Sequence, residues 1–422
     1  MSAPVSNSPT TRLYGPPHST AAPSQKSESG MRTRTTVLTA LAALTLPDAL
    51  STAPAALATT DTTRTATTQG KPGDIVTKSP TSFRTVPGAP VTTRSWHITY
   101  RSTTARGTAN TVSGTVIVPD DGKNGPRPLV TWGMGAVGLA DGCAASGRFP
   151  QGTSSEGQLI DLALRRGWAV AVSDYEGLGT PGDHTYTVGR SEGHALLDAA
   201  RAAQRLPEAG LSPDGPVGIM GYSQGGQAAG WAAQLRASYA PELRVKGTVA
   251  GGVPADLPAT LEYNDGSVGA GLALMALAGQ DAAFPELALD SYLNQKGKDD
   301  VAFMRNNCVS ISTIAGLFQN LSDVTVKDPL ASPLWQVALR ASYLGDRAPD
   351  HPVYLYQGTV DELIPYQVGA DLRTRWCEKG AQVEWKSYPT DHVTTAITGV
   401  PAAMAWLGGR LADEPAAGNC GT

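Results

Sequence analysis

A serine between closely spaced glycines is the feature that most restricts the fold of this chain. The segment Gly221-Tyr222-Ser223-Gln224-Gly225 directly follows the apolar residues 217–220 and opens a long stretch of small residues. A strand that turns sharply into a helix holds its serine in a strained conformation, and its neighbours must be small to avoid clashes. The pattern therefore predicts a strand, a tight turn and a helix, with Ser223 as a candidate nucleophile.

The same five-residue pattern occurs a second time, at Gly189-Arg190-Ser191-Glu192-Gly193. Residues 183–188, which precede this second match, are too polar for a buried strand. After it, leucine and alanine recur at helical spacing, so Ser191 and Glu192 are typical of the first turn of a helix. The context therefore favours Ser223 over Ser191 as the nucleophile.

The size of the chain allows a folded core, and its charge argues against strongly anionic partners. Its 422 residues, 41% of them hydrophobic, are enough for a substantial core. There are 33 lysines and arginines against 37 aspartates and glutamates, without a basic cluster in the part expected to fold. Neither a nucleic acid nor an anionic membrane surface is therefore expected as a partner.

The amino-terminal region predicts export from the cell. Met31-Arg32-Thr33-Arg34 carries two positive charges, residues 37–46 are apolar, and Ala56-Leu57-Ala58 is a small-residue cleavage site. The apolar run is too short to span a bilayer, so a signal peptide is expected at residues 31–58 and no transmembrane segment. Residues 1–30 are then an upstream extension, residues 59–85 a flexible linker, and the mature protein is extracellular.

The distribution of apolar runs predicts the fold class. Residues 94–103 and 111–119 suggest an antiparallel pair of strands, and later runs alternate with helical stretches, at 128–132, 168–172, 217–220, 245–249 and 352–356. This alternation predicts an α/β fold with a mainly parallel central sheet covered on both faces.

A helical insertion interrupts this alternation. Residues 256–345 predict a cap between two parts of the core, 86–255 and 346–422. Because it falls between two strands, the cap would lie above their carboxyl ends, where open α/β sheets bind ligands. A second helical layer without a substrate role is the alternative.

The partners of a serine nucleophile can be sought by their order in the chain. The serine needs a base and a third group that orients the base, and after a strand-to-helix elbow the acid and then the histidine follow. Asp361 comes just after the strand-like residues 352–356, and His392 is the histidine that lies beyond it. Glu362 and Asp391 are competing acids, although Asp391 is adjacent to His392 and poorly placed to reach its ring. Ser223, Asp361 and His392 are therefore the predicted triad.

The tetrahedral intermediate of acyl transfer also needs N–H donors for its oxyanion. One is expected from the backbone N–H of Gln224, and the other from the loop Gly133-Met134-Gly135-Ala136-Val137-Gly138. This loop also matches the Gly-x-Gly-x-x-Gly pattern of dinucleotide-binding folds. It is followed by further glycines and a proline instead of a helix, and Asp174 is too far along to be the acid that such folds need. A nucleotide cofactor is therefore not expected.

All four cysteines, Cys143, Cys308, Cys377 and Cys420, follow the predicted cleavage site. An even number in an exported chain indicates disulfides, and the spacing does not match a zinc site. No metal is expected. Four cysteines allow three pairings, and spacing alone does not choose among them.

Together these residues resemble the secretory lipase family of α/β-hydrolases, which includes the fungal lipase A type and many exported actinobacterial lipases. The resemblance covers roughly residues 86–422 and rests on Gly221-Tyr222-Ser223-Gln224-Gly225-Gly226, Asp174-Tyr175-Glu176-Gly177-Leu178-Gly179, Leu197-Asp198-Ala199-Ala200-Arg201-Ala202, and the tail from Cys377 through His392 to Cys420. It implies the α/β-hydrolase fold, the triad Ser223, Asp361 and His392, and a cap at about 256–345. It also implies the disulfides Cys143 to Cys308 and Cys377 to Cys420.

One departure from the family concerns the oxyanion loop. Bacterial members usually carry His-Gly-Thr where this chain has Met134-Gly135-Ala136. A side-chain donor is missing, so the second donor is expected to be only the backbone N–H of Ala136. Loss of one donor costs a factor of about 10² to 10³ in rate in a well-studied protease, so weak activity is compatible with this loop.

The chain is thus expected to be a secreted serine ester hydrolase that needs no metal or cofactor, and most specifically a triacylglycerol lipase. Its partner is a small-molecule or lipid ester, and any contact with a lipid interface is expected to be transient. A short-chain or polyester esterase would share every catalytic residue. A hydrolase-like binding protein of weak activity is the alternative that the oxyanion loop favours. Acyl-chain preference, interfacial activation and oligomeric state stay open.

Overall fold

A nine-stranded sheet organises the protein. The computed structural model describes residues 70–123 and 125–421. In these residues one sheet has the order β1-β4-β5-β7-β6-β8-β9-β10-β11, and β2 and β3 pair separately. The strands are Ile75–Thr81 (β1), Arg84–Val86 (β2), Ala89–Pro90 (β3), Thr93–Thr103 (β4), Ala109–Pro119 (β5), Leu129–Gly133 (β6), Ala169–Tyr175 (β7), Pro216–Tyr222 (β8), Arg244–Gly251 (β9), Val353–Gly358 (β10) and Val383–Tyr388 (β11).

Most of the sheet is parallel, which confirms the predicted fold class. The pairs from β7 to β11 all run parallel, whereas β1, β4 and β5 add an antiparallel edge. β6, β7 and β10 are buried along their whole length, which explains why they are mainly apolar. The carboxyl ends of the parallel strands meet at one edge of the sheet, and the loops that follow them form a common surface.

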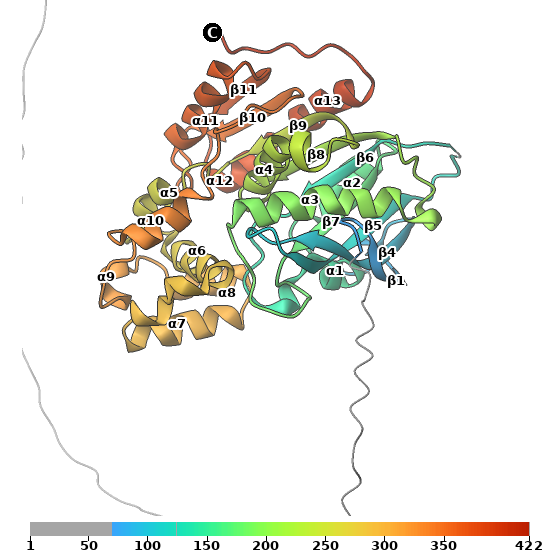
Figure 1. Ribbon diagram of the computed structural model, residues 1–422. Helices are drawn as coiled ribbons and strands as arrows, with labels where there is room; N and C mark the ends of the chain where they lie inside the picture. Colours follow the sequence, from blue (N-terminus) through green and yellow to red (C-terminus); the bar gives the residue numbers. More distant parts are fainter. Residues whose placement is uncertain (1–69, 124, 422) are drawn as a thin grey trace, which may run out of the picture. The chain divides into compact units, whose positions relative to one another are not determined.

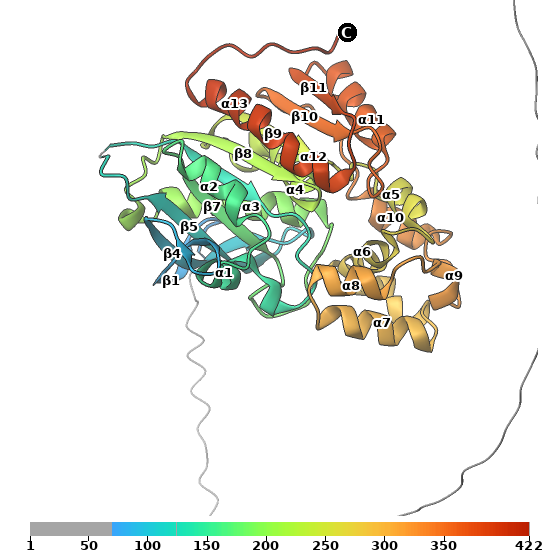
Figure 2. The ribbon, with the colours of Figure 1, turned by 180° about the vertical axis from the view of Figure 1, so that it is seen from behind.

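Helices cover both faces of the sheet. The α-helices of the described residues are Ala145–Arg148 (α1), Gly157–Leu164 (α2), Gly189–Gln204 (α3), Gln224–Tyr239 (α4), Leu257–Asn264 (α5), Ala270–Ala283 (α6), Gln295–Arg305 (α7), Val309–Ala315 (α8), Leu321–Val324 (α9), Pro333–Arg340 (α10), Tyr366–Glu378 (α11), His392–Thr398 (α12) and Val400–Leu411 (α13). Figure 1 shows α3 and α4 in front of the sheet, and Figure 2 shows α2 and α13 on the opposite face. Trp376 on α11 donates to Gln234 on α4, so α11 lies on the same face as α4.

The segment predicted as a cap, residues 256–345, contains α5 to α10 and no strand of the central sheet. These helices gather at one end of the sheet, in yellow and orange in Figure 1. They supply most of a second hydrophobic cluster, separate from the core around the sheet, which includes the fully buried Trp335 and also Leu139 and Tyr186 from outside the cap. In the part of the chain that the structure describes, no single helix is long and apolar enough to cross a membrane; only the bent pair formed by α6 and residues 285–291 passes that test of length and composition.

The prediction of a flexible linker up to residue 85 is wrong for its second half. Residues 75–81 form β1, which pairs with β4 at the edge of the sheet, and Arg84–Val86 forms β2. The side chains of β1 are largely exposed, so its sequence carries no apolar alternation that could have revealed it. The predicted signal peptide, the upstream extension and residues 59–69 of the linker lie outside the described residues.

Two disulfides join distant segments, with the pairing that the family resemblance implied. Cys143 is bonded to Cys308, and Cys377 is bonded to Cys420. The second bond fixes the carboxyl-terminal tail beside β11, where the Asn419 side chain also pairs with the backbone of Trp385 at 2.8 and 2.9 Å. β11 is the last strand of the sheet, so the tail covers an otherwise open edge.

We expect the double substitution Cys377→Ala with Cys420→Ala to lower thermal stability more than it changes the fold. The bond closes a loop with a sequence separation of 43 residues that includes β11, α12 and α13, and such cross-links typically contribute about 2 to 4 kcal/mol. The midpoint of thermal unfolding should fall by roughly 5 °C or more, while far-ultraviolet circular dichroism at room temperature stays unchanged. An unchanged midpoint would show that the tail is held by its hydrogen bonds alone.

Candidate active site

Ser223 occupies the sharp turn between β8 and α4. β8 ends at Tyr222 and α4 begins at Gln224, so Ser223 alone makes the turn, with φ 59° and ψ −123°. A Cβ atom on Gly221 would lie 2.1 Å from the Gly225 carbonyl oxygen, and one on Gly225 would lie 2.0 Å from the Gly133 carbonyl oxygen. Both glycines are therefore required by backbone contacts on either side of the serine.

The second serine of the same pattern lies in a different environment. Ser191 is in the first turn of α3, where it is buried, and its hydroxyl group donates a hydrogen bond to the carboxylate of Glu176. Thr185 also donates to Glu176, at 3.4 Å. This serine contributes to the packing of α3 against the loop before it, and it has no imidazole partner among the described residues.

Asp361 and His392 form a buried pair. His392 Nδ1 lies 2.8 Å from Asp361 Oδ2, which also accepts a hydrogen bond from Gln357 Nε2 at 2.8 Å. The other carboxylate oxygen accepts from the backbone N–H groups of Leu363 and Ile364, at 3.0 and 2.8 Å. Because a carboxylate oxygen faces Nδ1, this nitrogen carries the proton and Nε2 keeps its lone pair. The pair can therefore supply a base through Nε2.

The two competing acids have other contacts. Asp391 is the N-cap of α12 and accepts from the Thr394 backbone N–H at 2.8 Å. Glu362 accepts from the backbone N–H of His392 at 2.9 Å. Both acids thus hold the start of α12, and of the three candidates Asp361 is the one bonded to the imidazole ring.

His392 lies next to the strand end that carries Ser223. The Tyr222 hydroxyl group donates to the His392 carbonyl oxygen at 2.8 Å, and the two ring centroids are 4.9 Å apart. In the described part of the chain, no hydrogen bond joins the Ser223 hydroxyl to the His392 ring. Such bonds are often long without substrate and tighten when it binds.

The predicted oxyanion residues lie on two anchored segments. Gln224 is the first residue of α4, where backbone N–H groups have no partner within the helix. Ala136 belongs to the loop after β6, in which Gly135 donates its N–H to Glu156 Oε1 at 2.6 Å and the Met134 carbonyl accepts from Tyr175 at 2.8 Å. Val309 in the cap donates to the Val137 carbonyl at 2.8 Å, beside the Cys143–Cys308 bond.

Glu156 is a functional candidate that sequence reasoning missed. Its second oxygen, Oε2, accepts from Trp132 Nε1 at 2.6 Å, and burial raises the pKa of its carboxyl group. The acid therefore links the end of β6 to the loop that carries Ala136. Its sequence context, Thr153-Ser154-Ser155-Glu156, is typical of an exposed turn and contains no signal of this role.

A narrow, mostly apolar cavity of about 40 Å³ adjoins Ser223 and Gln224. Its other walls come from the loop after β9, the cap, the segment before α3 and the loop after β10: Tyr186, Thr187, Pro254, Leu257, Thr260, Leu261, Asn264, Leu272, Ala273, Ala276, Leu363 and Ile364. A larger hollow of about 540 Å³ lies on the cap but contains none of the predicted site residues. No group of three or more His, Cys, Asp or Glu in the described residues could hold a metal ion.

Known proteins share both the sequence and the fold. A model of the secretory lipase family matches residues 151–419. The secreted triacylglycerol lipase LIP4 of Malassezia globosa is 31% identical over 347 residues, which cover 77% of this chain and 74% of that lipase. Candida antarctica lipase A in its closed state has a TM-score of 0.75 and 25% identity, with 83% of this chain and 85% of that chain covered.

A more distant structure has the same fold. The rice cell wall degrading esterase LipA of Xanthomonas oryzae has a TM-score of 0.65 at 19% identity, with 82% of this chain and all of that chain covered. The family is a secretory one and the Malassezia relative is secreted, which agrees with the prediction of an exported chain. From the extent of these matches, the chain belongs to the secretory lipase family of α/β-hydrolases and is a carboxylic ester hydrolase.

Proposed function

We propose that this chain is a secreted triacylglycerol lipase that acts through an acyl-enzyme on Ser223, with His392 as the base and Asp361 as the residue that orients it. The observation that carries the proposal is the buried hydrogen bond from His392 Nδ1 to Asp361 Oδ2, beside the strand end that holds Ser223. The strained turn at Ser223 supports it, since a nucleophile elbow requires this conformation.

The reaction follows from the direction of these hydrogen bonds. His392 Nε2 removes the proton from the Ser223 hydroxyl as Oγ forms a bond to the ester carbonyl carbon. The resulting imidazolium faces Asp361, and it then gives the proton to the leaving alkoxide as the ester C–O bond breaks. A water molecule then gives a proton to the same nitrogen and attacks the acyl carbon. The bond from that carbon to Ser223 Oγ breaks, Oγ takes the proton back from the imidazolium, and the fatty acid is released. The cycle returns the proton and needs no cofactor.

The oxyanion donors in this proposal are both backbone groups. The N–H of Gln224 and the N–H of Ala136 face the oxygen that becomes negative in the tetrahedral intermediate. Ala136 has no side-chain donor, so rigid positioning of these two N–H groups has to supply the stabilisation. The bonds of the Ala136 loop to Glu156, Tyr175 and Val309 support this function.

Lipid esters are the proposed substrates because the wall of the cavity is largely aliphatic and the curated relatives are named triacylglycerol lipases. One observation favours a second candidate, a short-chain esterase. A cavity of about 40 Å³ is far smaller than the sites that bind drug-sized ligands, which measure about 300 to 1,000 Å³. A long acyl chain could enter only if α5 and α6 moved away from Ser223.

We expect Ser223→Ala to abolish ester hydrolysis and labelling by an organophosphonate, because it removes the atom that forms the acyl-enzyme. Rates on p-nitrophenyl butyrate and mass mapping of the labelled peptide measure both effects. The matched control is Ser191→Ala, which removes the same group from the same five-residue pattern and should keep both activities. A label on Ser191 would contradict the assignment.

The cavity predicts a dependence on acyl-chain length. Leu272 on α6 lines the cavity beside Ser223, and Leu272→Asp would place a charge where a long acyl chain has to lie. We expect kcat/KM for p-nitrophenyl laurate to fall about tenfold more than kcat/KM for the acetate, because acetate needs little apolar surface. Phe303→Asp, on an exposed apolar residue of α7 outside the cavity, is the control. Equal losses on both esters would show that the cap is structural only.

The cap also offers a surface for the proposed transient contact with lipid. α8 and the turn after it expose four large apolar side chains, of which Ile314 is 68% and Phe318 62% accessible; the others are Ile311 and Leu317. We expect Ile314→Ser with Phe318→Ser to lower the rate on emulsified triacylglycerol several-fold. The rate on soluble p-nitrophenyl butyrate should not change. Val76→Ser, on exposed strand β1, is the control, and an equal loss on both substrates would exclude this surface.

A further inference from the structure

The side chain of Gln224 is part of a buried polar network that the proposed reaction does not use. Gln224 is 2% exposed, and its Nε2 lies 2.9 Å from Glu192 Oε1 and 3.1 Å from His184 Nε2. Glu192 is in the first turn of α3, and His184 is in the loop before that helix. Gln224, whose backbone N–H is the proposed oxyanion donor, is therefore held in place by hydrogen bonds from its side chain. Both partners come from a different part of the chain.

The hydrogen-bond directions in this network are determined by His184. Its Nδ1 lies 2.8 Å from the Glu176 carbonyl oxygen, which accepts only, so Nδ1 carries the proton. Burial lowers the pKa of His184 to about 4, so the ring is neutral at neutral pH. Its Nε2 then accepts from the Gln224 amide, whose other hydrogen is donated to Glu192 Oε1.

Glu192 connects this network to the wall of the cavity. Its Oε1 also accepts from the Thr187 backbone N–H at 3.0 Å, and Thr187 lines the cavity with the unusual φ of 60°. The Thr187 carbonyl oxygen in turn accepts from Gln280 on cap helix α6, at 3.1 Å. Glu192 is fully buried, and its Oε2 has no hydrogen-bond partner among the described residues. A buried carboxyl oxygen without a hydrogen-bond partner destabilises the fold, so its presence calls for an explanation.

We propose that Glu192 is a positioning residue for acyl transfer: its carboxyl group fixes the Gln224 side chain, and thereby holds the Gln224 backbone N–H toward the oxyanion. The inference rests on the proposed function and deepens it. It matters in this chain because Ala136 has no side-chain donor, so any loss of alignment at Gln224 cannot be compensated by a side chain at position 136.

The charge state of Glu192 determines the pH range in which it can position Gln224 without repelling the oxyanion. Burial raises the pKa of Glu192 to about 8, although hydrogen bonds from Gln224 and Thr187 oppose the rise. The phenols of Tyr175 and Tyr186 interact electrostatically with Glu192. Burial raises the pKa of both phenols, so both stay neutral. Glu192 is therefore a neutral acid below about pH 8 and an anion above it.

Ionisation of Glu192 should slow the reaction. The ionised carboxylate of Glu192 would be bonded to the Gln224 side chain, close to the oxyanion that the Gln224 backbone N–H stabilises. The two negative charges would repel each other, and little water is present to screen them. We therefore expect kcat on a soluble ester to fall as pH rises through about 8. Glu192→Gln keeps an oxygen for Gln224 and Thr187 but cannot ionise. It should match the wild-type kcat near pH 7 and lose the alkaline decline.

Truncation tests the positioning itself. Glu192→Leu and Gln224→Leu each remove the bond between the two side chains while the Gln224 backbone N–H stays. We expect each to lower kcat about tenfold or more while KM for p-nitrophenyl butyrate changes less than about threefold. The double variant should be little worse than either single one, because both remove the same interaction.

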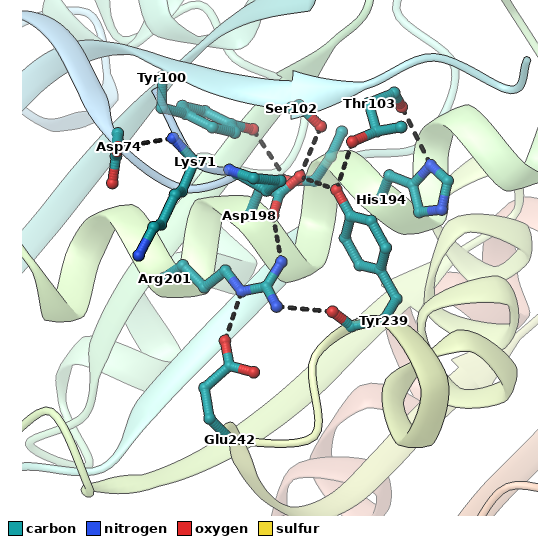
Figure 3. A network of polar contacts seen from close by, with 12 residues as sticks. Lys71, Asp74, Tyr100, Ser102, Thr103, His194, Asp198, Arg201, Tyr239 and Glu242 are labelled. Atoms are coloured by element: carbon teal, nitrogen blue, oxygen red, sulfur yellow. Dashed lines mark hydrogen bonds and ion pairs between the residues drawn. The ribbon is translucent and has the colours of Figure 1, made fainter. Parts of the chain in front are cut away.

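The chain offers a matched control in Asp198, a second buried acid on α3. Its carboxylate accepts from Ser102 at 2.8 Å, Tyr239 at 2.7 Å and Arg201 at 2.8 Å, in a network that includes none of the site residues (Figure 3). Burial raises its pKa to about 6. Asp198→Asn should lower the urea midpoint of unfolding through the loss of its ion pair with Arg201, but leave kcat and the alkaline decline unchanged.

The outcomes separate this inference from the proposed function. If the wild type hydrolyses esters and Ser223→Ala does not, the function stands, and the Glu192 variants decide the inference. An alkaline decline that persists in Glu192→Gln overturns it, and so does a Glu192→Leu variant that loses stability but keeps kcat, as the Asp198 control does. If Glu192→Leu does not fold, the pH profile of Glu192→Gln decides alone. A wild type without Ser223-dependent hydrolysis removes the proposed function and this inference together.

Discussion

The structure depends on the close approach of backbone segments around Ser223. Cβ atoms on Gly221, Gly225 and Gly226 would lie 2.1, 2.0 and 2.2 Å from carbonyl oxygens of Gly225, Gly133 and Gly251. Three neighbouring strands and α4 are thus packed without intervening side chains. This contact favours the strained turn at Ser223 and sets the distance from β8 to the loop after β6, which carries Ala136.

The parallel core could be predicted from the sequence because its strands are buried on both faces and read as short apolar runs. The predicted run at 217–220 falls within β8, and the run at 352–356 overlaps β10, which begins one residue later. Edge strand β1 could not be found in this way, since water solvates its side chains and no apolar pattern is required there. Asp361 and His392 are predicted as partners from their order in the chain. They can form a hydrogen bond because the parallel pairing of β10 with β11 brings the ends of these two strands together.

The two acids that position the oxyanion segments, Glu156 and Glu192, could not be predicted from the sequence for a different reason. Glu156 and Glu192 both stand in polar local contexts that are typical of a surface turn and of a helix start, and composition carries no information on which acids become buried. Their burial depends on the tertiary contacts of Trp132 and Gly135 in one case and Gln224 in the other. Such contacts join segments more than twenty residues apart, beyond the reach of any periodicity.

These two acids represent a compromise between stability and chemistry. Burial raises the pKa of both carboxyl groups, so the folded state disfavours their charged forms. The unfolded chain releases the Glu192 proton near the ordinary pKa of a glutamate, so this residue destabilises the fold increasingly as pH rises toward 8. A protein selected only for stability would replace such groups by apolar ones. Both acids lie beside the segments proposed to bind the oxyanion, Glu156 at Gly135 and Glu192 at Gln224. Their presence is explained if rigid positioning of the backbone donors benefits the reaction more than the lost stability harms the protein.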